Sequence, residues 1–90
     1  MTKKEAEALK KVINADRHYT TYFVNKTGAL RVRVYSYDGV ANGENYSPAK
    51  ERTEIAKLLN KVSNSGIRPK FEIDHKTYQG FIHDTNVVFQ

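Results

Sequence analysis

The chain has 90 residues, a net charge of +5 at pH 7 and no cysteine. The lack of cysteine excludes disulfide bonds, thiolate metal ligands and a cysteine nucleophile. Because so short a chain builds one small core, we expect a single domain over residues 1–90, without a buried catalytic cavity. The positive charge favours an acidic partner.

The N-terminal segment predicts a helix and not a targeting signal. Thr2 and Glu5 have the spacing of a capping box, which starts a helix at Lys3 that runs to about residues 14–16 and buries Leu9, Val12 and Ile13. No apolar run reaches ~18 residues, and the first residues lack the apolar centre of a signal peptide. We therefore expect a cytoplasmic protein with no membrane partner.

A hairpin is predicted after this helix. Residues 18–24 are rich in Tyr, Thr, Phe and Val, which favours a strand, and residues 29–37 form a second one. A turn centred on residues 26–27 pairs Phe23 with Leu30 on the core face. The same register pairs residues 22 with 31, 20 with 33 and 18 with 35 on the other face.

The second strand carries the main functional signal of the sequence. Successive side chains of a strand point to opposite faces, so alternate residues share a face. The aliphatic set, which seals the core, is Leu30, Val32 and Val34, with Ser36 following. The set predicted on the open face is Arg31, Arg33, Tyr35 and Tyr37, and Phe81 and His83 join it from the second half of the chain.

The second half repeats this order of elements. Residues 38–46 are a loop, Ser47 and Pro48 open a second helix, and Gly66 ends it. Strands follow at 70–74, where Phe71 and Ile73 point inward, and at 78–83, with turns at 74–77 and 84–86. The tail, residues 87–89, can pair as a fifth, edge strand.

The predicted fold class is α+β, a two-layer αββαββ arrangement. Its antiparallel sheet has four strands, or five with the tail, and both helices cover one face. At an offset of fifty, Lys26 and Thr27 coincide with Lys76 and Thr77, each pair in a predicted turn. This match raises the hypothesis of an αββ repeat over residues 2–37 and 47–83.

The function that this pattern favours is a non-enzymatic binding module. Guanidinium groups bind phosphates through paired donors, and aromatic rings stack on bases, so nucleic acid is the expected ligand. The predicted ligand-binding residues are His18, Tyr22, Arg31, Arg33, Tyr35 and Tyr37. We predict no catalytic residue and no cofactor. We also predict no metal site, because the adjacent residues of Asp74–His75 and of His83–Asp84 point to opposite faces of a strand.

Three alternatives stay open. The same face suits an inhibitor or adaptor of the kind found in phages, because Tyr and Arg dominate protein interfaces. A small ribonuclease is the best enzyme hypothesis, since His, Arg, Lys, Tyr and carboxylates are all present. A dimer through the edge at residues 87–89 is the third.

Overall fold

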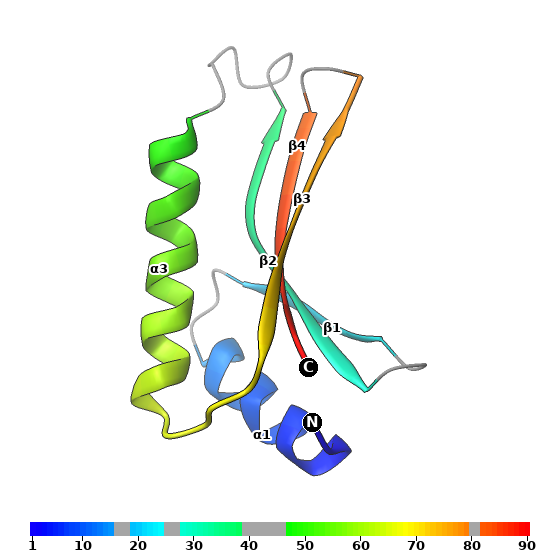
Figure 1. Cartoon of the computed structure of the whole chain (residues 1–90), viewed down its shortest axis with the longest axis vertical. Helices are drawn as coiled ribbons and strands as arrows, with labels where there is room; N and C mark the ends of the chain where they lie inside the picture. The colour runs from blue at the N-terminus through cyan, green and yellow to red at the C-terminus, as the bar shows by residue number, and fades with distance from the viewer. Residues whose placement is uncertain (16–18, 25–27, 39–46, 80–81) are drawn as a thin grey trace.

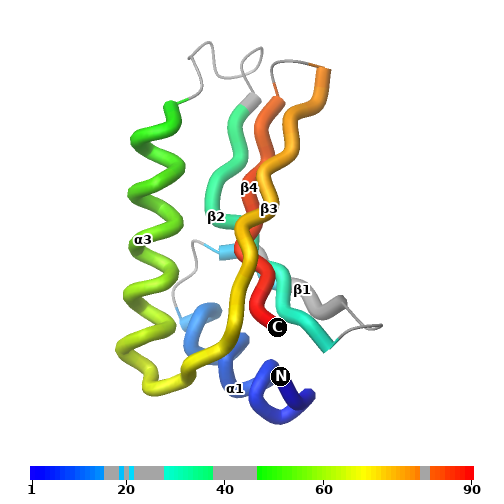
Figure 2. Tube along the Cα trace, viewed as in Figure 1, coloured from blue at the N-terminus to red at the C-terminus, as the bar shows by residue number. Residues whose placement is uncertain are grey.

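The computed structural model of the chain describes residues 1–15, 19–24, 28–38, 47–79 and 82–90 (Figures 1 and 2). Only the backbone is described at residues 20, 22–24 and 38. The described elements are helices and an antiparallel sheet, so the predicted α+β class is confirmed. In chain order they are α1 (Lys3–Asn14), β1 (Thr20–Val24), β2 (Ala29–Asp38), α3 (Pro48–Asn64), β3 (Phe71–Tyr78) and β4 (Ile82–Phe89).

Helix α1 begins at the predicted capping box. The Glu5 backbone N–H donates to Thr2 Oγ1 at 3.1 Å, and the Thr2 N–H donates to Glu5 Oε1 at 3.2 Å. These bonds satisfy backbone donors that have no carbonyl partner at a helix start. The residues that α1 buries are Ala6, Leu9 and Ile13.

Helix α3 also follows its predicted boundaries. Ser47 Oγ accepts from the Lys50 N–H at 3.2 Å, and Pro48 occupies the first turn, where its missing N–H costs no hydrogen bond. Beyond the helix, Gly66 has φ +84°, a conformation that glycine adopts without strain. The apolar stripe of α3 consists of the buried Leu58 and Val62 and the partly buried Ile55 and Leu59.

The strands form one antiparallel sheet in the order β1-β2-β4-β3. The first hairpin has the predicted register, with Phe23 opposite Leu30 and Tyr22 opposite Arg31. Strand β4 pairs with both β2 and β3, so β1 and β3 are the edges of the described sheet (Figure 1). His18, expected opposite Tyr35, lies outside the described residues.

The second hairpin differs from the prediction. Residues 74–77, predicted to turn, lie within β3, and residues 84–86 lie within β4. The chain leaves β3 at Gln79, which has φ 54°. Two strands of eight residues pair more backbone groups than the shorter strands that we predicted. Lys76 and Thr77 are therefore strand residues and not turn residues, whereas Lys26 and Thr27 lie outside the described residues.

The predicted fifth strand is also wrong. Residues 87–89 end β4, where Val87 lies between Val32 of β2 and Ile73 of β3. A segment that is paired on both sides has no free backbone edge. Self-association through residues 87–89 is therefore contradicted.

The core lies between the sheet and the two helices, which cover the same face (Figure 1). Phe71 and Ile73, predicted to point into this core, are 46% and 43% exposed. They belong to the edge strand β3, whereas α3 packs on β2. Among the described helices, none is both long and apolar enough to cross a membrane. The buried core cluster consists of Leu9, Ile13, Leu30, Val32, Val34, Leu58, Val62, Val87 and Phe89.

Candidate functional site

The Arg/Tyr set predicted on one open face lies on two faces. Along β2 and β4, Arg33 is opposite Asn86, but Tyr35 is opposite Thr85, so the register shifts by one residue between them. Such a bulge inserts an extra residue, and the side chains beyond it point to the other face. The two arginines remain on the uncovered face of the sheet, and the two tyrosines turn toward the helices.

Burial and contacts agree with this division. Tyr37 is only 6% exposed, and the Tyr35 ring packs against the core cluster. The Tyr35 hydroxyl accepts from the backbone N–H of Ser47, the cap of α3, at 3.5 Å. The expected joint Arg/Tyr surface is therefore wrong. His83, which we also expected on the open face, is opposite Tyr37 and lies on the helix side with it.

The arginines on the uncovered face are paired with aspartates of the same face. Arg31 Nη1 lies 2.6 Å from Asp74 Oδ2, and Arg33 Nε lies 2.9 Å from Asp84 Oδ1. Tyr22 is opposite Arg31 in the backbone register, and its side chain is not described. The charged side chains that the described register places here are Arg31, Arg33 and Lys76 against Glu72, Asp74 and Asp84. The described part of this face is thus of mixed charge.

The structure brings together a polar cluster that the sequence did not predict. We call the side chains of Glu51, His75, Thr77, His83 and Thr85 the His/Glu cluster. It lies on the helix side of the sheet, at the first turn of α3, and draws on α3, β3 and β4. The His75 Nδ1–H donates to Glu51 Oε2 at 2.6 Å, and the fully buried Thr85 hydroxyl donates to the same oxygen at 2.7 Å.

The register of the second hairpin explains why this cluster was missed. Our turn at residues 74–77 separated His75 from His83. In the observed hairpin, His75 is opposite Thr85 and Thr77 is opposite His83, so both imidazoles share a face. The glycine at position 80 is the sequence signal that could have placed the turn later in the chain.

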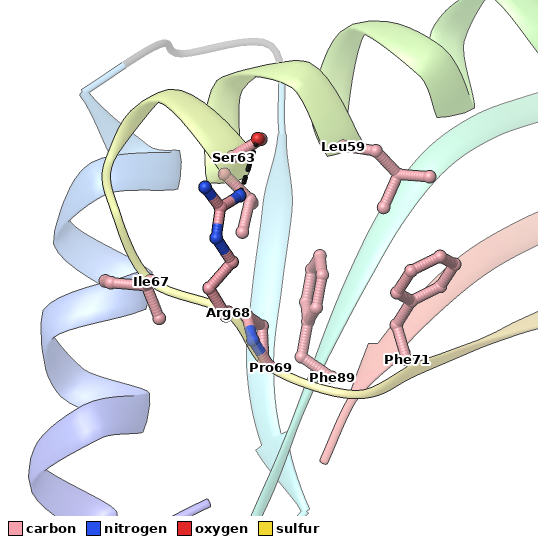
Figure 3. Close-up of a pocket in the computed structure, with 8 residues that line it drawn as sticks. Leu59, Ser63, Ile67, Arg68, Pro69, Phe71 and Phe89 are labelled. Atoms are coloured by element: carbon pink, nitrogen blue, oxygen red, sulfur yellow. Dashed lines mark hydrogen bonds between the residues drawn. The ribbon is translucent and has the colours of Figure 1, made fainter.

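The β3 edge is a third feature of the surface. The large hydrophobic side chains that the structure describes as exposed are Phe71, Ile73 and Tyr78, and all three belong to β3. Beside Phe71 is a hollow of about 200 Å³ between the end of α3 and the start of β3. Figure 3 shows its lining, in which the Arg68 guanidinium reaches Ser63 Oγ at 2.9 Å.

Comparisons of the chain with family models, curated proteins and solved structures found no match. The candidate surfaces are therefore weighed on their own chemistry. They are the mixed-charge uncovered face, the His/Glu cluster and the apolar β3 edge.

Proposed function

We propose that this protein is a non-enzymatic binding module for another protein, and that an extended segment of the partner adds to the sheet along β3. One observation carries the proposal. The described exposed large hydrophobic side chains, Phe71, Ile73 and Tyr78, all lie on a strand at the edge of the sheet. An edge strand presents backbone donors and acceptors that another strand can pair with.

The side chains of β3 supply contacts on both sides of such an added strand. By register, Phe71 and Ile73 lie on the helix side, opposite Phe89 and Val87, and Tyr78 lies on the uncovered side. The hollow beside Phe71 is lined by apolar groups such as Leu59 and has room for an apolar anchor of the partner. Main-chain pairing would provide affinity and the hollow would provide selectivity.

The charges of the uncovered face support a protein partner over nucleic acid. A phosphate chain is attracted to unneutralised cations, whereas Arg31 and Arg33 each lie against an aspartate. The Arg33–Asp84 pair is exposed and contributes about 0–1 kcal/mol, so a partner can exchange it for its own charges. Binding of nucleic acid by these arginines, expected from the sequence, stays a prediction and forms the second arm of the test.

The test is an amide-shift NMR titration of the labelled 90-residue chain with two probes. The first is a set of ten-residue peptides selected by display on the protein, and the second is a single-stranded RNA at low and moderate salt. We expect the peptides to shift the amides of residues 71–78. If only the RNA causes shifts, if these lie at residues 31–33, and if they weaken as the salt concentration rises, the ligand is nucleic acid and not a protein.

A charge placed on the edge provides the control. Ile73→Lys should weaken the binding of the selected peptides at least tenfold, because a lysine desolvated against an apolar strand is unfavourable. Ala56→Lys adds the same charge on the exposed surface of α3 and should leave peptide affinity unchanged. Equal affinities for both variants, or peptide shifts away from β3, would refute docking at this edge.

A further inference from the structure

Three polar atoms of the His/Glu cluster converge on one point. His75 Nε2 and His83 Nδ1 lie 3.1 Å apart. Thr77 Oγ1 lies 3.4 Å from His75 Nε2 and 3.4 Å from His83 Nδ1. The three atoms form a nearly equilateral triangle, which is contributed by two neighbouring strands.

This triangle has the dimensions of one face of a tetrahedral metal site. Zinc–nitrogen bonds of about 2.0–2.1 Å at tetrahedral angles separate neighbouring ligand atoms by about 3.3–3.4 Å. The observed separations of 3.1–3.4 Å fall close to this value. A divalent ion can therefore replace the proton that the two facing imidazole nitrogens would otherwise share.

Glu51 prepares His75 for such a role. A carboxylate only accepts hydrogen bonds, so the 2.6 Å contact places the imidazole proton of His75 on Nδ1 and leaves the lone pair on Nε2. The hydroxyl of Thr85 holds the same carboxylate oxygen. A histidine that ligates a metal through one nitrogen commonly donates from the other to a carboxylate, which orients the ring.

We propose that His75, His83 and Thr77 bind a divalent transition-metal ion, with Zn²⁺ as the ion of choice, and that Glu51 is a positioning residue. Imidazole nitrogen suits Zn²⁺, Cu²⁺ and Ni²⁺ better than Mg²⁺ or Ca²⁺. The described part of the chain has no group of three or more His, Cys, Asp or Glu side chains that could hold a metal ion, so the third ligand of the proposed site is the weaker threonine hydroxyl. The remaining position belongs to water. His75 and Thr77 belong to β3, the strand of the proposed docking edge, but metal binding involves their side chains and is measured on the protein alone, without a bound peptide.

The test is a titration of the metal-free 90-residue protein with Zn²⁺, monitored by calorimetry and by NMR of the imidazole nitrogens. We expect one ion per chain. The nitrogens that shift as metal ligands should be Nε2 of His75 and Nδ1 of His83, while Nδ1 of His75 keeps its proton. This assignment is read from the wild-type protein, so it holds even if a variant fails to fold.

Matched variants separate the site from general surface binding. His83→Ala should lower Zn²⁺ affinity more than tenfold, and Glu51→Gln by about tenfold, the size usual for a group that orients a ligand. His18→Ala removes the remaining histidine of the chain and should leave affinity unchanged. Absence of Zn²⁺ binding, coordination through other nitrogens, or equal affinity in all variants would overturn the proposal.

Discussion

At the scale of single residues, burial decides what two touching aromatic rings contribute to stability. Phe71 and Phe89 lie opposite each other on β3 and β4, with ring centroids 6.3 Å apart. Phe89 is fully buried, whereas Phe71 is 46% exposed. We expect Phe89→Ala to lower the free energy of unfolding by about 3–5 kcal/mol, because it loses apolar contacts and leaves a cavity. Phe71→Ala should cost about 1 kcal/mol.

Urea denaturation followed by circular dichroism measures both values. Should Phe89→Ala leave too little folded protein, Phe89→Leu provides the comparison, since it keeps most of the buried volume and should cost about 1.5 kcal/mol or less. Equal losses for the two alanine variants would contradict the observed placement of β3 at the sheet edge.

The division of β2 by its bulge makes a second comparison at residue scale. Tyr37 lies beyond the bulge and is buried, whereas Arg33 precedes it with a side chain 44% exposed. We expect Tyr37→Ala to cost about 3–5 kcal/mol of unfolding free energy, as for other buried aromatics. Arg33→Ala loses an exposed ion pair and should cost no more than about 1 kcal/mol. A regular strand would give similar, small losses at both positions, which denaturant titration can exclude.

At the scale of elements, the start of α1 makes a pH-dependent contribution. The side-chain hydrogen bond with Thr2, followed by the backbone hydrogen bond with Thr2, lowers the pKa of Glu5 below its ordinary value. A carboxyl group with a lowered pKa in the folded state stabilises the fold above its unfolded pKa. This stabilisation is lost as the pH falls through the lowered, folded pKa.

We expect Thr2→Ala to raise the pKa of Glu5 toward its ordinary value, because it removes the Thr2 hydroxyl, the largest cause of the lowering. The measurement is an NMR titration of the Glu5 carboxyl carbon in both proteins. Thr53→Ala, which alters an exposed threonine of α3, is the control and should leave this pKa unchanged. An unchanged Glu5 titration in Thr2→Ala would contradict the contribution of the Thr2 hydroxyl to this pKa.

The elements also show which features could be predicted from sequence. Helix boundaries depend on short-range signals, such as Ser47 with Pro48, and these were read correctly. The second hairpin offered two competing turns, and an alternating strand pattern fits either of them. The sequence pattern gives no sign of the bulge. Val34 and Tyr35 continue the alternation of aliphatic and polar or aromatic residues, although both side chains pack on the helix side.

The candidate site was harder to predict for a related reason. The pairing of His75 with His83 depends on the register of β3 with β4, and the approach of Glu51 depends on how α3 packs on the sheet. Neither follows from local residue patterns. The arginines were placed correctly on the uncovered face, but their aspartate partners come from β3 and β4, whose order in the sheet the sequence did not reveal.

At the scale of the whole molecule, the strand order β1-β2-β4-β3 decides which parts of the sheet can open to a partner. Strand β4 is enclosed by two neighbours, so its amide hydrogens should exchange only when the whole fold opens. Strand β3 pairs on one side within the described sheet. We therefore expect alternate amides over residues 71–78 to exchange fast, and their neighbours, which bond to β4, to exchange slowly.

Hydrogen exchange followed by NMR tests this order directly. Had the strands lain in chain order, β3 would be enclosed and residues 82–89 would show the alternation, so that pattern would contradict the topology. The fast amides of β3 are also the groups that the proposed partner strand would cover. If a bound peptide slows the exchange of these β3 amides and leaves the exchange rates of β4 unchanged, the peptide binds at the free edge of the sheet, as proposed. If the peptide instead slows the exchange of amides outside β3, the strand order still holds but the proposed docking at β3 is refuted.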